Sequence, residues 1–299
     1  MGNQIVISFI SFLGLFTLIG ILSARRARGS AEDYYLAGRS VNPWFVALSA
    51  VATNNSGFMF IGLIGVTYTM GYAGAWIMIG WVVGDYLSWL LVHRRLREQS
   101  EALHVNSIPG YLGELKGGHS RAVVVVAALI TFVFLSLYAA AQLKAGSKAL
   151  HVLFGWRYHT GALMGAAIVL VYCFAGGIRA SIWTDVAQSV VMMLAMGTLI
   201  GVTLYHTGGL TGLHQRLYGL DPALVQIFPS NMKMGAFVWI LGWVGAGFGT
   251  MGQPHIMVRA MTIRSPKEIN KARNIYLVWF ALFSAAAIGV GLASRVLLA

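Results

Sequence analysis

The sequence predicts an all-α integral membrane protein that crosses the bilayer about eight times. Of its 299 residues, 58 % are hydrophobic and only 10 % are charged, whereas about a quarter of the residues of a soluble domain are charged. Apolar segments of about 20 residues, long enough as helices to cross a bilayer, recur along the chain. Glycine, with 36 residues, is favoured where membrane helices pack closely. We therefore expect lipid to surround most of the protein.

Eight segments meet the length that a membrane span requires. They lie near residues 4–24, 43–69, 73–92, 122–148, 160–177, 183–205, 236–257 and 275–297. The first segment has no basic residue before it, and a cluster of arginines follows it, which is the wrong order for a cleaved signal peptide. This order favours a first span whose N-terminus lies outside.

The distribution of basic residues supports that orientation. Eight spans place the connections 25–42, 93–121, 178–182 and 258–274 inside, and most of the 21 Lys and Arg residues fall there, as the positive-inside rule requires. The net charge of +12 is then directed at the cytoplasm and at anionic lipid heads, not at nucleic acid. The inner basic residues are Arg25, Arg26, Arg28, Arg39, Arg94, Arg95, Arg97, Lys116, Arg121, Arg179, Arg259, Arg264, Lys267, Lys271 and Arg273, and the outer ones are Lys148, Arg157, Arg216, Lys233 and Arg295.

Two of the spans carry residues that break helices. The second contains the run 52–57, which reads Ala-Thr-Asn-Asn-Ser-Gly, and the seventh has five glycines between 242 and 252, directly before Gln253-Pro254-His255. Backbone at membrane depth unwinds only where protein or water satisfies it. Interrupted segments in corresponding halves of a chain indicate the binding site of a transporter.

The first broken span supplies the first group of candidate site residues. An unwound backbone at Ala52 would expose carbonyl oxygens suited to a small cation, and the side chains of Asn54, Asn55 and Ser56 could bind an ion or a solute. The alternative is that these side chains only form hydrogen bonds between helices.

Charged and titratable residues inside spans supply the second group, because a charge at membrane depth is costly and is usually retained for a task. Asp185 opens the sixth span and either serves ion binding or caps the helix. Asp85 and Lys144 lie in neighbouring spans and could form an ion pair, or Lys144 could extend toward the outer surface. His255 could relay protons, or it could cap a helix end.

The connections are too short to hold a soluble catalytic domain, and no motif for a zinc ion, a phosphate or a catalytic triad is present. We therefore expect a transporter and not an enzyme, with no organic cofactor. A membrane sensor or regulatory module derived from a carrier remains a second class of function.

Several stretches resemble the sodium:solute symporter family, and within it the sodium/proline branch. They span residues 33 to 259 and include the hallmark 176–188, with Trp183-Thr184-Asp185, and Gly252-Gln253-Pro254-His255 with Arg259. The other stretches are 33–40, 47–62 and 107–112.

The resemblance implies one peripheral helix, at 4–24, before a core of two inverted five-helix repeats. Residues 43–205 would form the first repeat and 236–297 the first two helices of the second, all within one membrane transport domain, 1–299. The chain would then be C-terminally truncated relative to the family and inactive alone, unless a second chain supplies the missing helices.

The resemblance also implies roles for individual residues in sodium-coupled symport of a small organic solute, such as an amino acid. Sodium would be bound by the carbonyls of Ala52 and Asn55, with Asp185 in the ion path. Arg39 would serve gating or coupling, and we expect the same role for Asp85 and Lys144 because of their charge inside the spans. The residues expected near the solute are Asn54, Ser56, Tyr138, Ala246, Thr250 and Gln253.

The chain departs from the proline branch in its expected pocket. Asn54 stands where that branch has aspartate, and Ala246 and Thr250 replace a tryptophan and a tyrosine. Proline itself therefore remains one of several candidate solutes, and a proton remains the alternative to sodium as the coupling ion.

Overall fold

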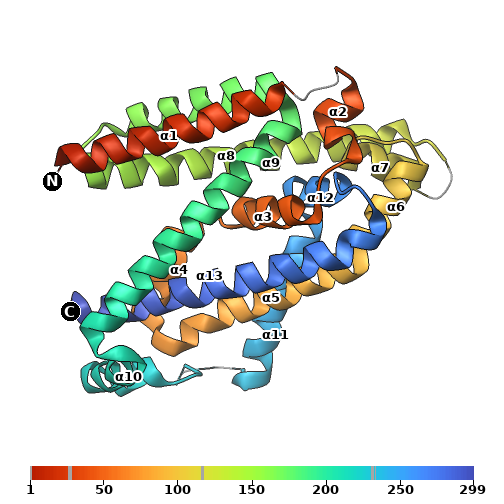
Figure 1. The fold of residues 1–299 in the computed structure, drawn as a ribbon. Helices are drawn as coiled ribbons and strands as arrows, with labels where there is room; N and C mark the ends of the chain where they lie inside the picture. The colour runs from red at the N-terminus through yellow and green to blue at the C-terminus, as the bar shows by residue number, and fades with distance from the viewer. Residues whose placement is uncertain (1, 26–28, 116–117, 230–231, 233) are drawn as a thin grey trace. The chain divides into compact units, whose positions relative to one another are not determined.

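The computed structural model describes residues 2–25, 29–115, 118–229, 232 and 234–299. These residues form helices and no strand pairing beyond one isolated bridge, between Val41 and Ile263, which confirms the all-α class (Figure 1). Among the basic residues that the positive-inside count used, Arg26, Arg28, Lys116 and Lys233 lie outside the described residues. The chain divides into two compact units, which are described separately.

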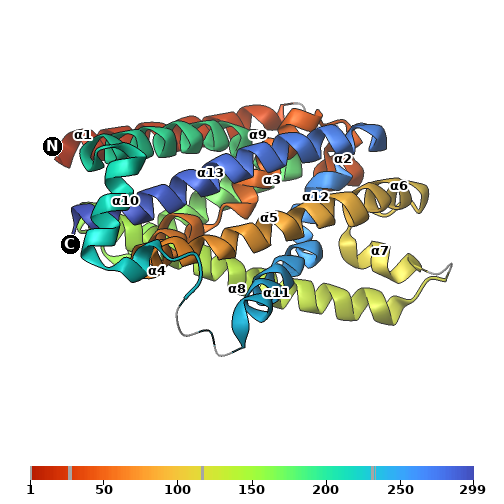
Figure 2. The same ribbon diagram turned by 90° about the horizontal axis from the view of Figure 1, so that it is seen from below.

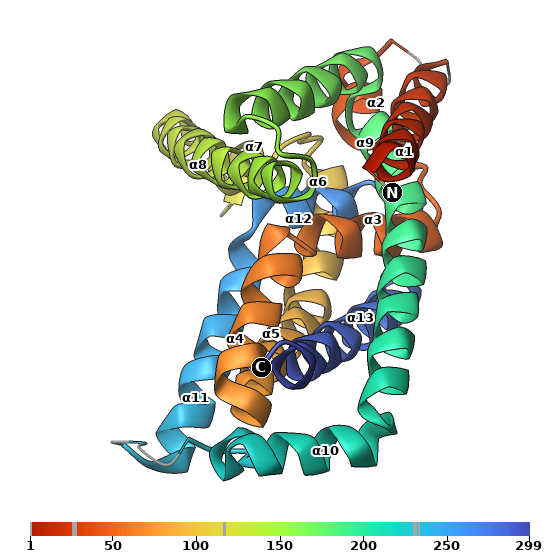
Figure 3. The ribbon, with the colours of Figure 1, turned by 90° about the vertical axis from the view of Figure 1, so that its left-hand side faces the viewer.

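The first unit comprises Met1–Asn54, His93–Gln188 and Pro254–Ala272. Its long apolar helices are α1 (Gly2–Ala24), α8 (Arg121–Phe154) and the first part of α9 (Tyr158–Thr207). Short elements connect and flank them, and Figure 3 shows α7 beside α8. These elements are α2 (Ala31–Leu36), η1 (Ala37–Arg39), α3 (Pro43–Asn54), α6 (Arg94–Ala102), α7 (Ile108–Glu114), α12 (Pro254–Met261) and η8 (Pro266–Glu268), together with the start of α13.

Local sequence explains where several of these helices begin. The hydroxyls of Ser30, Ser107 and Ser120 accept hydrogen bonds from backbone amides in the first turns of α2, α7 and α8, as N-cap residues do. Helix α8 ends at Gly155, which adopts the left-handed conformation that favours glycine.

The second unit comprises Asn55–Val92, Ser189–Gln253 and Arg273–Ala299. Helices α5 and α11 pack against each other (Figure 2), and Leu292 and Ala293 of α13 form an apolar cluster with Leu213, Leu217 and Leu224. Its elements are the π-helix η2 (Phe58–Gly62), α4 (Leu63–Met70), η3 (Gly71–Ala75), α5 (Trp76–Ser88), most of the π-helix η4 (Trp89–His93), the last part of α9, α10 (Gly209–Leu220), η6 (Pro222–Val225), α11 (Gly235–Gly247), η7 (Phe248–Gly252) and most of α13 (Ile269–Leu297).

Both predicted helix breaks are confirmed. Helix α3 ends at Asn54, Asn55 and Ser56 are not helical, and the helix resumes with η2. Helix α11 tightens into the 3₁₀ turn η7, Gln253 adopts an extended conformation, and α12 begins at Pro254. Proline is tolerated at a helix start because its missing amide hydrogen would have no partner there.

One prediction about the chain's path is wrong. The sequence suggested a connection at 178–182, but these residues are helical, and the two helical parts of α9 (Tyr158–Thr207) meet at a kink at Gly177, whose φ of 55° and ψ of −143° are not helical. A side chain on Gly177 would meet the backbone of Tyr34. Glycine therefore bends the chain here without a loop.

Six helical segments of the described residues are long and apolar enough to span a membrane, and Tyr158–Val171 is a shorter apolar helix. The expected count of eight spans stays a prediction, because the second predicted span is divided between α3 and α4. The six segments are Gln4–Ser23, Phe58–Ala102, Arg121–Phe154, Gly176–Thr207, Gly235–Gly252 and Pro266–Leu297.

Candidate ion and solute site

The break after α3 places polar groups at the end of a short helix. Ala52 lies in the last turn of α3, where carbonyl groups have no partner within the helix. Asn55 is buried, and neither atom of its side-chain amide has a hydrogen-bond partner in the part of the chain that the structure describes. A buried polar group without a partner is rare and calls for a ligand, a water or an ion.

Ser56 has a structural role that the sequence did not predict. Its hydroxyl accepts a hydrogen bond from the amide of Phe58 at 3.3 Å, and its carbonyl accepts one from the amide of Met59 at 3.0 Å. Ser56 therefore caps the helical segment that follows the break, in the way that serine caps many helix starts. A role beside the solute stays a prediction.

Asp185 of α9 is the centre of a polar cluster in the first unit. Its Oδ2 atom accepts hydrogen bonds from the hydroxyls of Ser49 at 2.7 Å and Ser181 at 3.4 Å, and from that of Thr53 at 3.5 Å. Ser49 and Thr53 belong to α3, so the last two turns before the break lie against this carboxylate.

Arg259 of α12 completes the same cluster. Its Nη2 atom lies 2.9 Å from Asp185 Oδ2 and 3.1 Å from the Ser181 hydroxyl, and its Nε donates to the Ser49 hydroxyl at 2.8 Å. The side chains of Arg259 and Asp185 are only 8 % and 14 % exposed. Two opposite charges in such a place are tolerated because they are paired and hydrogen-bonded.

The structure corrects two predictions about this cluster. Asp185 does not cap a helix, because it lies inside α9, eight residues past the bend at Gly177. Arg259 does not lie in a loop, because it is a buried residue of α12. The sequence assigned no site role to Arg259, Ser49 or Ser181. Arg259 and Asp185 are 74 positions apart, so no local sequence pattern indicates that they pair.

Tyr138 and His255 are brought together. Their rings lie 4.9 Å apart between centroids, with the tyrosine on α8 and the histidine in the first turn of α12. Both ring nitrogens of His255 are buried without a hydrogen-bond partner among the described residues. The two residues are thus neighbours, which no local pattern in the sequence predicts.

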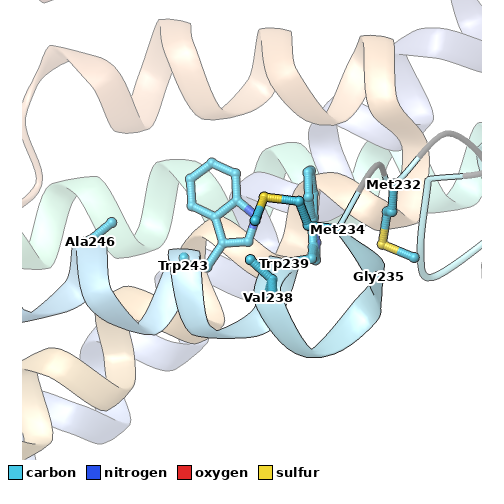
Figure 4. A pocket seen from close by; sticks show the side chains of 8 residues that line it. Met232, Met234, Gly235, Val238, Trp239, Trp243 and Ala246 are labelled. Atoms are coloured by element: carbon cyan, nitrogen blue, oxygen red, sulfur yellow. The ribbon is translucent and has the colours of Figure 1, made fainter.

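The remaining expected solute residues lie in the second unit. Thr250 is buried and its hydroxyl donates to the carbonyl of Gly247 at 2.9 Å. Ala246 lines a largely apolar cavity of about 440 Å³ with Trp239 and Trp243 (Figure 4). Gln253 is the non-helical residue between η7 and α12. Their contact with a solute stays a prediction.

Arg39 ties three chain segments of the first unit together. Its guanidinium donates to the Ser100 hydroxyl and carbonyl, to the carbonyls of Val105 and Met261, and to the carboxylate of Glu32 at 3.0 Å. Burial lowers the pKa of Arg39, and the hydrogen bond with Glu32 opposes that effect. Arg39 therefore anchors the turn η1 to α6 and to the end of α12, and its expected part in gating stays a prediction.

Asp85 and Lys144 belong to different units, so their expected ion pair stays a prediction. Asp85 of α5 is 2 % exposed and accepts a hydrogen bond from the hydroxyl of Tyr276 on α13 at 2.6 Å. Lys144 is an exposed residue of α8. Among the described residues, no group of three or more His, Cys, Asp or Glu side chains gathers that could hold a metal ion in the usual way.

Comparisons with known proteins place this geometry in context. The family model described as "Sodium:solute symporter family" matches residues 34–299. The chain is 35 % identical over 276 residues to the high-affinity proline transporter PutP of Bacillus subtilis, covering 92 % of this chain and 57 % of that protein. It is 34 % identical over 293 residues to sodium/proline symporter 2 of Staphylococcus saprophyticus, covering 97 % of this chain and 56 % of that protein.

A solved structure shares the fold. The substrate-bound, outward-open state of a Na⁺-coupled sialic acid symporter matches with a TM-score of 0.80 and 20 % sequence identity, over 99 % of this chain and 60 % of that one. The chain thus spans little more than half the length of the relatives that it matches.

Proposed function

Because the chain belongs to the sodium:solute symporter family, we propose that it serves the sodium-coupled uptake of a small organic solute, with proline or a related amino acid as the first candidate. The curated relatives named above are proline carriers. The chain is a multi-pass membrane protein, and we place it in the cell (inner) membrane with its N-terminus outside. We propose transport without an enzymatic step or an organic cofactor.

The observation that supports this proposal best is the position of Asp185 against the end of α3. The carboxylate lies within hydrogen-bond distance of Ser49, one turn before Ala52. Carbonyl oxygens at a helix break, beside a largely buried carboxylate, offer the hard oxygen ligands that a small cation prefers. In this proposal Ala52, Asn55 and Asp185 serve sodium.

The solute would be bound by groups at or near the two breaks and by Tyr138. We assign Asn54, Ser56 and Gln253 to its polar groups and Tyr138 to its ring or aliphatic part, with Ala246 and Thr250 on the wall. Sodium would favour the outward-open state and complete the solute site, and closure would then release both inside. Arg39, Asp85 and Lys144 would act on that closure.

The domain assignment follows the family. We assign 4–24 to a peripheral helix, 43–205 to the first five-helix repeat and 236–297 to the first two helices of the second, within one transport domain. The partners in this proposal are sodium, the solute and lipid.

Uptake into proteoliposomes tests the proposal. The chain is reconstituted alone and together with the C-terminal part of the Bacillus subtilis relative that lies beyond the aligned region. We expect radiolabelled proline to accumulate under an inward sodium gradient and not under a potassium gradient. We expect Asp185→Asn to abolish the sodium effect, whereas Asp221→Asn, at an exposed helix cap, leaves it unchanged.

Two results would contradict this proposal. Uptake that a proton gradient drives equally well with or without sodium would indicate a proton-coupled carrier, with His255 and its unpartnered ring nitrogens as the next residue to change. Sodium-driven uptake that survives in Asp185→Asn would remove Asp185 from the ion path.

A further inference from the structure

The guanidinium of Arg259 lies among oxygen atoms that could otherwise face a metal cation. Three oxygens surround it: Asp185 Oδ2 at 2.9 Å from Nη2, the Ser181 hydroxyl at 3.1 Å from Nη2, and the Ser49 hydroxyl at 2.8 Å from Nε. Hydroxyl and carboxylate oxygens are hard ligands that suit small hard cations. Arg259 thus occupies a position where a cation would find its ligands.

The hydrogen bonds of the cluster lead to one oxygen. The described donors to Asp185 are Ser49, Thr53, Ser181 and Arg259, and all of them reach Oδ2. A cation that binds this oxygen must replace at least one of these donors. It must also approach a fixed positive charge in a place where water screens little, so the arginine opposes its binding.

We propose that Arg259 is a built-in competitor of sodium at Asp185 and so sets the sodium affinity of the protein. Without sodium, the guanidinium neutralises the carboxylate. When sodium binds, the guanidinium moves away from Asp185 and Ser49. This inference rests on the proposed sodium-coupled function, and it adds a residue that controls how tightly the ion is held.

The position of Arg259 links this competition to the second helix break. Arg259 lies in α12, one turn after His255, and its Nη1 atom donates to the His255 carbonyl. The helix follows the non-helical Gln253 and contacts α3. A guanidinium that leaves Asp185 therefore changes the hydrogen bonds of the segment that carries Gln253, where the solute is proposed to bind.

Lysine cannot take over both contacts of the arginine. A guanidinium donates from Nε and Nη2 in fixed directions, whereas an ammonium is a compact point charge on a flexible stem. Arg259→Lys keeps the charge but not the simultaneous contacts with Ser49 and Asp185. Arg259→Gln removes the charge. The two variants therefore separate the effect of charge from that of geometry.

Direct binding of radioactive sodium tests the inference. The protein is purified in nanodiscs in the reconstituted form that gives the strongest sodium-stimulated uptake, and half-saturation is measured against potassium. We expect Arg259→Gln to lower the half-saturating sodium concentration at least tenfold and Arg259→Lys to lower it less. Arg264→Gln, an exposed neighbour paired with Glu268, is the matched control and should leave it unchanged.

The direction of the change distinguishes competition from a purely structural role. Removing a competitor tightens sodium binding in Arg259→Gln, whereas the loss of a purely structural contact with Ser49 and Asp185 would weaken it. Hydrogen exchange gives a second readout, because sodium should raise exchange of the α12 amides in the unmodified protein and not in Arg259→Gln.

The outcomes separate the two levels of the proposal. Saturable sodium binding whose midpoint is the same in the unmodified protein and in folded Arg259→Gln overturns the role of Arg259 alone. If Arg259→Gln does not fold, an unchanged midpoint in Arg259→Lys overturns it equally. A protein in which no variant binds sodium, and whose uptake ignores sodium, contradicts the proposed function itself.

Discussion

The two units of the chain are stabilised by different interactions. In the first unit, buried ion pairs tie short helices and turns together, as in Arg179–Asp33 and Arg259–Asp185. In the second unit, α5 and α11 approach so closely that a methyl group on Gly80 or Gly84 would meet the backbone of Trp243 or Gly247. Charge pairing thus fixes the region proposed to bind the ion, and close backbone contact fixes the long helices.

This difference arises because long helices in lipid and short helices are stabilised by different kinds of contact. Helices packed in lipid gain little from burying apolar surface against one another, so small residues that allow close approach stabilise their contacts. A short helix such as α12, with eight residues, has too little packing surface for that. The position of α12 therefore depends on polar contacts such as those of Arg259. In our proposal a cation replaces the contact of Arg259 with Asp185.

The largest expected effect comes from breaking a buried ion pair of the first unit. Arg179→Gln leaves Asp33, whose side chain is 3 % exposed, without its charged partner. Removing one partner of a buried pair costs about 3–5 kcal/mol. We expect a loss of that order in the free energy of unfolding, measured by titration with a denaturing detergent.

The double variant Asp33→Asn/Arg179→Gln is the control for that prediction. It removes both charges, so it should recover part of the loss. A single Arg179→Gln variant as stable as the unmodified protein would contradict the view that charge pairing stabilises the first unit.

A smaller effect is expected at the glycine contacts of the second unit. Gly84→Ala places a methyl group against the backbone of Gly247, and overpacking of this kind costs about 1–3 kcal/mol. Gly245→Ala is the matched control on α11, because nothing lies within 4 Å of the added methyl group. The same titration should therefore find Gly84→Ala destabilised and Gly245→Ala at least as stable as the parent, since alanine favours a helix over glycine. Equal stabilities for the two variants would show that close backbone contact does not stabilise this unit.

The sequence predicted those features of the fold that have a local cause. Both helix breaks were visible because asparagine, glycine and proline weaken a helix wherever they occur. The bend at Gly177 was mistaken for a loop, because a run of glycine and arginine is typical of both. Only the approach of Tyr34, far away in the sequence, explains why glycine suffices there.

The sequence predicted several residues of the candidate site, but not which of them contact one another. Local patterns indicate Asp185 and the run around Ala52, and the structure places the Thr53 hydroxyl, next to Ala52 in the chain, 3.5 Å from Asp185 Oδ2. The pairing of Arg259 with Asp185 could not be predicted, because an arginine at the inner end of a span satisfies the positive-inside rule equally well when it is exposed. Burial beside Asp185 is a property of the tertiary structure, and no single segment of the sequence encodes it.

The smallest effect should come from an exposed ion pair of the first unit. This pair tests whether an ion pair must be buried to stabilise that unit. Arg94 and Glu98 are one turn apart on α6, 3.0 Å between Nε and Oε1, with side chains 55 % and 44 % exposed. Water and salt screen such a pair, so it contributes about 0.3–0.5 kcal/mol. Glu98→Gln, which keeps a similar helix propensity, should therefore change the free energy of unfolding by no more than that. A loss as large as that of Arg179→Gln would mean that the number of charges, and not their burial, stabilises the first unit.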